Sequence, residues 1–231
     1  MGELTAAPAM SVAHDRAMTL PLSPDELLTT TRSVRKRLDL DRPVPLELVK
    51  ESLEVALQAP TGSNQQGWHW MVVTDAGLRK QIGDYYAQSF GGYRDSAIRR
   101  NAAAGHSTER QAVQDRVQSS ADWLAEHMGE VPVHVIGCIT AGEELPTGNQ
   151  AGLWGSLLPA AWSYQIAARA RGLGSAWTTL HLKYEKEISE LLGIPPNVRQ
   201  GVLLPTAYFT GETFKPAKRE PLDTVLHVDS W

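Results

Sequence analysis

The chain has 231 residues, of which 42% are hydrophobic, so it can bury one sizeable core, and its composition requires no second domain. Its 22 basic and 26 acidic residues give a formal net charge of -4, which disfavours a general binder of nucleic acid or anionic membranes. The single cysteine, Cys138, lies in an apolar stretch, which excludes an intrachain disulfide and disfavours a cysteine-based metal site. These features favour a reducing, cytoplasmic location.

Residues 1–22 are expected to form a flexible tail ahead of one domain that covers residues 23–231. The tail is rich in alanine, proline and serine, and His14, Asp15 and Arg16 interrupt the apolar stretch that a signal peptide requires. No stretch of the sequence approaches the ~20 apolar residues needed to cross a bilayer. We therefore expect no membrane partner.

The first ordered element is a helix that is expected to run from residue 24 to about residue 30. Ser23 stands at the N-cap, Pro24 at the first helical position and Glu26 three residues after the serine, which is the pattern of a capping box. After the basic segment 31–38, a second helix is expected to start near Pro45. Its apolar residues recur at helical spacing: Val49, Leu53, Ala56 and Leu57.

The loop from Ala59 to Trp68 joins this helix to a strand and contains small side chains and hydrogen-bond donors, but no acid, base or thiol. Such a loop can hold a ligand but cannot itself perform chemistry. If the protein is an enzyme, its reactive atom is expected to belong to a bound cofactor. The alternative interpretation of this loop is a simple helix stop followed by a turn.

Residues 68–74 are expected to form a buried strand, and Thr74 with Asp75 caps a helix that reaches about Gln88. Residues 89–107 show no clear periodicity. A helix resumes near Thr108 with one apolar face, made by Val113, Val117, Leu124 and Met128. This polar excursion is either a lid over a site or a solvated helical insertion.

The second half begins with a nearly continuous apolar run at residues 131–140, which predicts a central strand. Residues 152–171 form a helix that is apolar on almost every side and must therefore be covered all round. The chain's own sheet can cover one side, and a second subunit the other. We therefore expect a homodimer.

The remaining elements are a helix at residues 183–192, which ends at Gly193, and a buried strand at residues 201–209. A polar connector, residues 210–221, then leads to a short apolar stretch at residues 225–228. A connector this long is unusual inside a compact domain. It is explained if the C-terminal stretch joins the sheet of the partner subunit.

Four segments, in this order, resemble the FMN-dependent nitroreductase family from about residue 23 to the C-terminus. They are Arg32-Ser33-x-Arg35, Ala59-Pro60-Thr61-Gly62-x-Asn64-x-Gln66-x-Trp68, Gly172-Leu173-Gly174-Ser175-x-Trp177 and Lys218-Arg219-x-Pro221-Leu222. The resemblance implies an α+β, three-layer fold with a central, mainly antiparallel sheet flanked by helices. It also implies a homodimer with an exchanged C-terminal strand and two FMN sites at the subunit interface.

The resemblance further implies ping-pong chemistry, in which NADPH or NADH reduces FMN and the reduced flavin then reduces a nitroaromatic or quinone-like acceptor. No side chain is then expected to be catalytic, because the chemistry takes place at flavin N5. The reactive group would be the cofactor.

The family pattern assigns a role to each matched segment. A phosphate dianion needs cations and fixed donors, which Arg32, Ser33, Lys218 and Arg219 supply. Arg35 would lie near flavin N1 and the C2 carbonyl, where a guanidinium stabilises the reduced form. Taken alone, the segment from Arg32 to Arg37 is better explained as a solvated basic turn, and only the other matched segments favour a binding role.

Two further groups complete the expected site. The first would come from the opposite subunit and pack against the flavin: Pro60, Thr61, Gly62, Ser63 and Asn64. The second would lie beside the ring, with a backbone N–H near N5: Trp177, Thr178, Thr179 and Leu180. For the Trp177 side chain, ordinary core packing is an open alternative.

The sequence departs from the family at three places. Thr31 precedes Arg32 where many members have two arginines, and Gly67 replaces a common proline. Thr179 and Leu180 stand where many relatives have an acid or glycine followed by glycine. The ring environment near N5 is therefore expected to differ.

Other interpretations are less consistent with the sequence. Gly172-Leu173-Gly174 follows a helix and lacks a third glycine, so it is not a Rossmann fingerprint. The seven histidines show no metal-binding spacing, and His69 and His134 are expected to be structural. Three alternatives stay open within the fold: reductive dehalogenation, flavin fragmentation and non-enzymatic flavin sequestration. A nucleic-acid partner is disfavoured because the chain is acidic.

The expected partners are a nicotinamide dinucleotide and a small aromatic acceptor. The choice between NADPH and NADH is open. The cations considered for a 2′-phosphate are Arg94, Arg99 and Arg100.

Overall fold

The computed structural model describes residues 19–103 and 107–231, apart from the side chains of Arg100 and Ala102. Most of the expected N-terminal tail therefore lies outside the described residues. At the start of the described chain, the Leu20 N–H donates a hydrogen bond to the Ala170 carbonyl at 2.6 Å. The first described residues are thus attached to the end of the long helix in the second half of the chain.

Four strands form one sheet in the order β1-β2-β4-β3, and every neighbouring pair is antiparallel. The strands are β1 (Trp68–Val73), β2 (Val133–Thr140), β3 (Leu173–Ser175) and β4 (Val198–Tyr208). The prediction of an α+β fold with a mainly antiparallel sheet is confirmed. The strand β3 was not predicted, because three residues are too few to show an alternating pattern.

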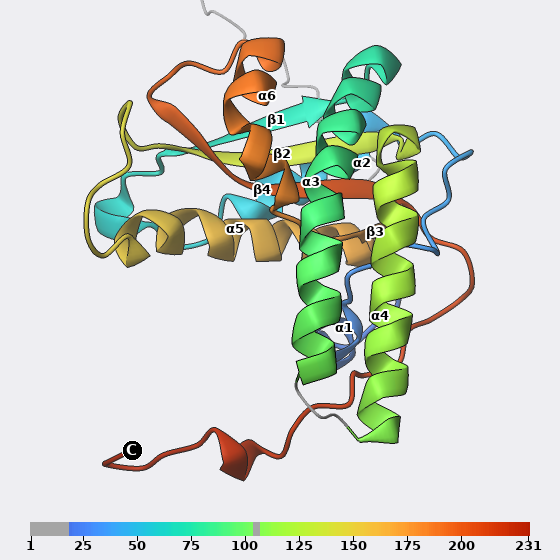
Figure 1. Cartoon of the computed structure of the whole chain (residues 1–231). Helices are drawn as coiled ribbons and strands as arrows, with labels where there is room; N and C mark the ends of the chain where they lie inside the picture. The colour runs from blue at the N-terminus through green and yellow to red at the C-terminus, as the bar shows by residue number, and fades with distance from the viewer. Residues whose placement is uncertain (1–18, 104–106) are drawn as a thin grey trace, which may run out of the picture.

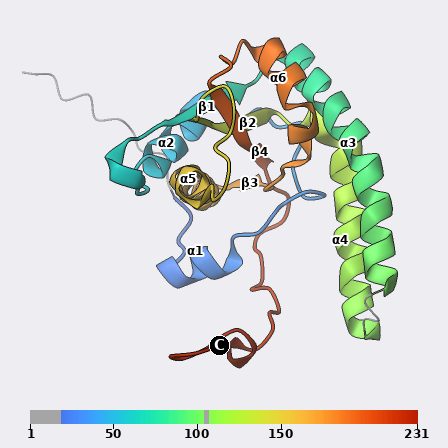
Figure 2. The ribbon, with the colours of Figure 1, turned by 60° about the vertical axis from the view of Figure 1, so that its left-hand side comes forward.

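Helices cover both faces of this sheet, as Figures 1 and 2 show. On one face lie α2 (Leu46–Ala56) and α5 (Ala151–Ala170), with α1 (Pro24–Thr30) beside them. On the other lie α3 (Ala76–Ala103), α4 (Thr108–His127) and α6 (Glu185–Leu192). Short 3₁₀ turns connect them at η1 (Gly62–Asn64), η2 (Met128–Glu130), η3 (Leu180–Tyr184) and η4 (Leu222–Thr224).

The central strand β2 is buried on both faces, as its apolar run predicted. Val133 and Val135 pack in the core cluster that contains α2 and α5 residues, while Ile136 and Cys138 pack in the cluster that contains α3 and α6 residues. This is the two-residue alternation of a strand. Burial, with a smaller contribution from Glu185, raises the pKa of the Cys138 thiol to about 12, so the thiol is unreactive.

Local signals at the helix ends behave as predicted. The Ser23 hydroxyl accepts from the Glu26 N–H at 3.2 Å, and the Glu26 carboxylate accepts from the Ser23 N–H at 2.8 Å. Gly193 ends α6 in the left-handed region, with φ 66°. Each of these ends depends only on residues within a few positions, so the sequence alone predicts it.

The predicted end of α3 near Gln88 is wrong. The helix continues for 28 residues, through Gly91 and Gly92, to Ala103. Phe90 and Ala97 on the continuing helix are buried, and α3 packs along α4. Helix pairing therefore compensates for the weak helix propensity of the glycines.

The predicted apolar face of α4 is only half right. Leu124 and Met128, which follows the helix directly, are completely buried, but Val113 and Val117 are 38% and 47% exposed. The reason is that the outer parts of α3 and α4 project beyond the sheet, as Figure 1 shows. The exposed valines instead line a cavity that is described below.

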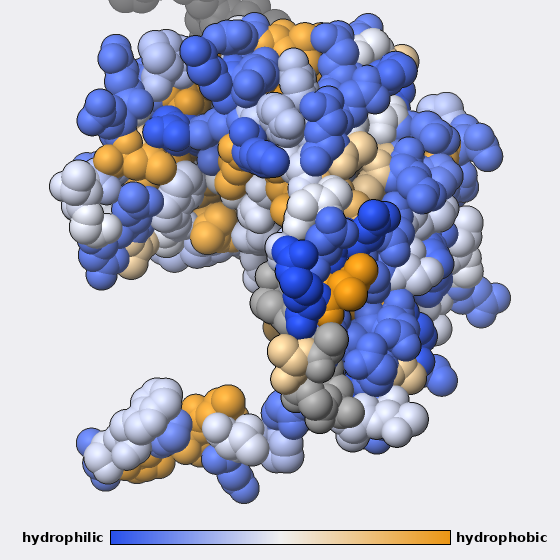
Figure 3. Space-filling model, in the orientation of Figure 1, coloured by the Kyte–Doolittle hydropathy of each residue, from blue (hydrophilic) through white to orange (hydrophobic). Residues whose placement is uncertain are grey.

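After β4 the connector first stays against the core through Phe209 and Phe214, and residues 209–231 contain η4 but no strand within this one chain. Figures 1 and 3 show the C-terminal arm, residues 222–231, standing away from the rest of the molecule, with hydrophobic side chains on its surface. Most of these side chains are largely exposed: Leu222 66%, Val225 69%, Leu226 52%, Val228 72% and Trp231 100%. An exchanged C-terminal strand stays a prediction.

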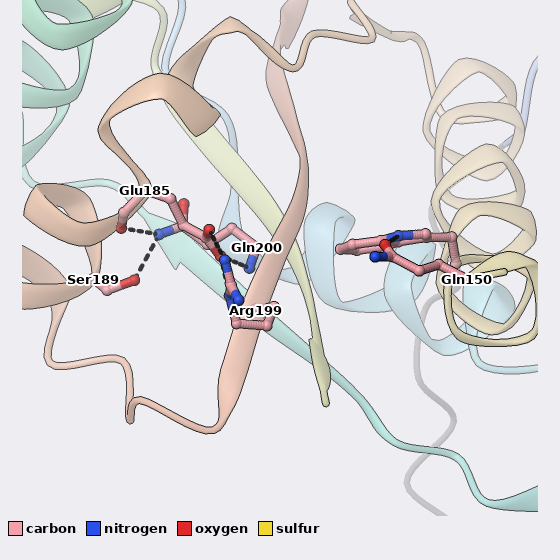
Figure 4. Close-up of polar contacts among 6 residues, drawn as sticks. Gln150, Glu185, Ser189, Arg199 and Gln200 are labelled. Carbon is pink, nitrogen blue, oxygen red and sulfur yellow. Dashed lines mark hydrogen bonds and ion pairs between the residues drawn. The ribbon is translucent and has the colours of Figure 1, made fainter. Parts of the chain in front are cut away.

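A polar network fixes α6 to the start of β4, as Figure 4 shows. The Glu185 carboxylate accepts from Arg199 Nε at 2.9 Å and from the Gln200 N–H at 2.9 Å, and Gln200 Nε2 donates to Ser189 Oγ at 2.9 Å. Burial raises the pKa of Glu185, but the bonds from Arg199 and Gln200 outweigh it, so the net pKa lies below the ordinary value. This carboxylate is therefore ionised and structural.

Two completely buried histidines predict that the protein loses stability in mild acid. His134 bonds the Met128 carbonyl at 2.8 Å through Nε2, and within the described residues neither ring nitrogen of His181 has a partner. Burial lowers the pKa of His134 to about 4 and that of His181 to about 3. Both rings are therefore neutral in the folded protein at neutral pH.

The sign of the pH effect follows from these lowered pKa values. Above pH 6.5, the ordinary histidine pKa, neither state binds the protons and stability is complete. Below this pH the histidines bind protons in the unfolded chain but not in the folded one. Each ring therefore lowers the free energy of unfolding by about 1.4 kcal/mol per pH unit. Urea unfolding should show this slope between about pH 6 and about pH 4.5, and His181→Leu should reduce it. An unchanged slope in the variant would contradict the assignment.

Candidate functional site

A cavity of about 650 Å³ lies between the basic segment after α1, the outer half of α4 and the connector that precedes the C-terminal arm. Five of the predicted site residues line it: Arg32, Ser33, Arg35, Lys218 and Arg219. Near the cavity, Arg32 Nη1 donates to the Lys215 carbonyl at 2.8 Å, although the two residues are 183 positions apart. The structure thus brings together the two halves of the predicted phosphate clamp.

The edge of the sheet positions the basic segment. The Val34 N–H donates to the Ser175 carbonyl at 2.8 Å, and Ser33 forms a parallel bridge with Ser175. Val34 is buried against Gly174, where an added Cβ would lie 3.1 Å from the valine side chain. Because the buried valine fixes the backbone, the polar residues on either side of it are held at the cavity.

The cavity is strongly basic, since six cationic side chains and only two carboxylates line it. Lys218 Nζ pairs with Glu109 at 2.7 Å, and Arg110 pairs with Glu220 at 2.8 Å. Both exposed pairs join α4 to the connector. Within the described part of the chain, Arg219 has no ion pair or hydrogen bond, so its charge is available to an anionic ligand.

The Arg35 guanidinium donates to Ser120 Oγ at 3.5 Å, and no described carboxylate pairs with it. Burial lowers its pKa, and the neighbouring Tyr86 and Tyr93 act in the opposite direction. Tyr86 is itself buried, which raises its pKa, while Thr178 and Arg35 lower it. Tyr86 therefore lies near two predicted site residues that are far apart in the sequence.

The segment after β3 lies beside the basic segment, but its side chains have different roles. The Trp177 N–H donates to Ser33 Oγ at 3.4 Å, while the indole packs in the core beside α2 and α5. The Thr178 backbone pairs with Leu203, and the Leu180 side chain packs in the other core cluster. Thr179 is exposed, and its carbonyl accepts from the Leu182 N–H at 3.1 Å.

The loop residues Pro60, Thr61, Gly62, Ser63 and Asn64 do not line this cavity. They lie against α5 instead, where the Gly62 N–H donates to Ser156 Oγ at 3.1 Å. Ser63 and Asn64 have positive φ angles of 51° and 53°, and Gln66 has 50°. Such strained conformations of non-glycine residues cluster at ligand clamps. A role in binding would therefore require the loop to act on a second subunit, as the resemblance implies.

The sequence left open whether the region of α4 covers a site, and it identified none of the α4 residues that line the cavity as site residues. Its lining residues recur at helical spacing: Val113, Arg116, Val117 and Ser120. Arg94 and Arg99, two of the cations considered for a 2′-phosphate, do not line it. Arg94 lies 3.8 Å from Asp95, and Arg99 bonds Ser96 at 3.3 Å. The Arg100 side chain lies outside the described residues. The spacing along α4 is visible in the sequence, but an apolar stripe of this kind is equally typical of a buried face.

Two other kinds of site are not found in residues 19–103 and 107–231. No three histidine, cysteine or acidic side chains gather there in a metal-binding group. None of the helices in this part of the chain combines the length and apolar character needed to span a bilayer.

Comparison with known proteins supports the family suggested by the sequence. The model of the nitroreductase family matches residues 28–208. Iodotyrosine deiodinase 1 of Rattus norvegicus is 24% identical over 209 residues, which cover 87% of this chain and 67% of the rat protein.

Two solved structures share the fold. An oxidised iodotyrosine deiodinase bound to FMN and 3-iodo-L-tyrosine has a TM-score of 0.65 and 22% identity, over 90% of this chain and 99% of that one. The FMN-dependent nitroreductase NfnB of Mycobacterium smegmatis, in complex with NADPH, has a TM-score of 0.61 and 20% identity, over 89% of this chain and 97% of that one. With the family model matching most of its length, this chain belongs to the nitroreductase family.

Proposed function

We propose that the protein is an FMN-dependent oxidoreductase that takes a hydride from NADPH or NADH and passes it to a nitroaromatic or quinone-like acceptor. The observation that carries the proposal is the convergence of Arg32, Ser33, Arg35, Lys218 and Arg219 on one basic cavity. When bound, FMN would supply the redox chemistry, accepting and donating hydride at N5. The protein would bind, orient and shield it.

The residues present suit this cofactor. Arg32, Ser33 and Arg219 offer charged and neutral donors for a phosphate dianion. Lys218 lines the same cavity and forms an ion pair with Glu109. Arg35 is a partly buried cation without a carboxylate partner among the described residues. Such a charge would stabilise the anionic reduced flavin. The Trp177–Leu180 segment would lie beside the ring.

The direct test is to purify the protein with FMN and mix it anaerobically with NADPH or NADH. Loss of the flavin absorbance, followed by its return when a nitroaromatic or quinone is added, is the expected result. If neither nicotinamide reduces the bound flavin, the proposed function is wrong. If reduction occurs without rapid reoxidation by any acceptor, flavin sequestration becomes the better explanation.

A homodimer is part of the same proposal. The loop Pro60–Asn64 would complete the partner's flavin site, and the exposed residues Pro159 and Trp162 on α5 would meet the second subunit. The apolar C-terminal arm would bury its side chains on that subunit. In a single chain most of the residues in these three features are exposed.

Replacing Val225 and Val228 by serine is therefore expected to weaken the dimer. The two side chains are 69% and 72% exposed in the single chain, and burying each on a partner would contribute about 1.5 kcal/mol or more. Sedimentation velocity should show dissociation at protein concentrations where the wild type stays dimeric. Asp223→Ser, on the same arm, is the matched control. Equal dimer stability in the valine variant and the control would rule out the arm as an interface.

A second candidate activity is reductive dehalogenation, since the relatives include iodotyrosine deiodinase. Release of iodide from 3-iodotyrosine by the reduced protein, with no reduction of nitroaromatics, would favour it. Flavin fragmentation would instead appear as breakdown products of FMN after exposure of the reduced protein to oxygen.

A further inference from the structure

A second cavity, of about 440 Å³, adjoins the first and shares Arg32, Ser33, Arg35 and Ser120 with it. It extends in the other direction, toward Lys36, Arg37 and Lys215, which do not line the first cavity. Five cationic side chains line this second cavity and no carboxylate does. It thus differs from the first cavity, where Glu109 and Glu220 neutralise two of the cations.

The cations of the second cavity bond only to neutral oxygens. Lys36 Nζ donates to Ser119 Oγ at 2.7 Å. Arg37 donates through Nε to the Thr210 carbonyl at 2.6 Å and through Nη1 to the Thr213 carbonyl at 2.9 Å. These bonds hold the side chains in place but leave their positive charges without a counter-ion among the described residues.

A further cation stands behind the wall of this cavity. The guanidinium carbons of Arg37 and Arg169 lie 4.1 Å and 5.0 Å from the centre of the Phe214 ring. Arg169 is 3% exposed, and its Nε and Nη1 atoms have no hydrogen-bond partner in the part of the chain that the structure describes. Burial lowers its pKa, and the charge of Arg37 lowers it further. The electrostatic repulsion among these like charges is unfavourable, and an anion bound in the cavity would reduce it.

We infer that this second cavity is a phosphate-dianion subsite of the flavin site, and that its ligand is the 2′-phosphate of NADPH. This inference rests on the proposed function and adds a preference for NADPH over NADH. The 2′-phosphate is the group that distinguishes the two nicotinamides. Arg35 and Ser120 line both cavities. If the nicotinamide ring of a dinucleotide binds at the flavin beside Arg35, its 2′-phosphate would therefore bind in the adjoining cavity.

The test compares Lys36→Gln, Lys215→Gln and the double variant with the wild type. Both substitutions remove a charge outside the FMN clamp, and glutamine at position 36 can still donate to Ser119. Lys50→Gln is the matched control, because Lys50 is exposed on α2 and pairs with Glu47 at 3.7 Å. Flavin reduction is measured anaerobically with NADPH and with NADH.

The ratio of kcat/KM for NADPH to that for NADH should fall roughly tenfold in each single variant and roughly 100-fold in the double variant. The NADH values and the control should stay unchanged. An unchanged ratio in the double variant, or a wild type that does not prefer NADPH, would overturn the NADPH assignment.

A second experiment measures binding directly. It distinguishes the 2′-phosphate of a nucleotide from free phosphate, and it tests this inference independently of the proposed function. Adenosine 2′-monophosphate, adenosine and inorganic phosphate are titrated calorimetrically into the FMN-loaded wild type and the double variant. Lys36- and Lys215-dependent binding of adenosine 2′-monophosphate, with none of adenosine, supports the inference even if no nicotinamide reduces the flavin. Equal binding of inorganic phosphate assigns the subsite to free phosphate instead. If neither anion binds, the cavity is only a solvated basic surface and the inference fails.

Discussion

Replacing Arg219 by glutamine is expected to weaken FMN binding about 10- to 100-fold while leaving riboflavin binding nearly unchanged. Arg219 lines the basic cavity and has no ion pair or hydrogen bond within the described chain, so the substitution breaks no polar contact there. Arg32 is a less clean choice, since it bonds the Lys215 carbonyl, and Lys218 pairs with Glu109. The loss should therefore report on the phosphate of the ligand alone.

Quenching of flavin fluorescence on titration with apoprotein measures both affinities. The matched control is Arg94→Gln, which removes an arginine that lies near Asp95 outside the cavity. The comparison with riboflavin is decisive, because riboflavin lacks only the phosphate. If Arg219→Gln weakens both flavins equally, this arginine does not bind the phosphate and the proposed clamp is incorrect.

Gly83→Ala is expected to destabilise the fold by about 3 kcal/mol, the largest change in stability that we predict. Gly83 lies on α3 where the helix crosses η2. An alanine Cβ there would lie 2.6 Å from the Gly129 nitrogen and 2.8 Å from its Cα. These are backbone atoms, so the contact cannot be relieved by rotating a side chain. The helix would have to move away from η2, next to the buried Met128.

Gly91→Ala is the matched control, since it lies on the same helix and its added Cβ would have no atom within 4 Å. This substitution should stabilise the protein by about 0.5–1 kcal/mol through the higher helix propensity of alanine. Urea unfolding of the two variants and the wild type measures the difference. Equal midpoints for Gly83→Ala and the wild type would show that α3 and η2 are not packed this closely. Destabilisation by Gly91→Ala would instead argue against a continuous α3.

Local signals were sufficient for much of the fold. The capping box at Ser23, the left-handed Gly193 and the apolar run of β2 each depend on hydrogen bonds or periodicity within a few residues. They could therefore be recognised without knowledge of the tertiary structure. The helix α3 could not be followed past Gln88, because burial of Phe90 and Ala97 beside α4 comes from a different part of the chain.

For the candidate site, too, one part could be predicted from the sequence and another part required the tertiary structure. The motifs Arg32-Ser33-x-Arg35 and Lys218-Arg219 could be selected from the sequence because cations suit a phosphate, and the resemblance placed them together. Only the tertiary structure decided that α4 forms the third wall, joined the cavity to a second one lined by Lys36, Arg37 and Lys215, and separated Pro60–Asn64 from both. Residue chemistry is a local property that the sequence displays directly. Which charges share a cavity, and which of them keep a counter-ion, depends on packing between segments as far apart as Arg32 and Lys215, 183 positions along the chain.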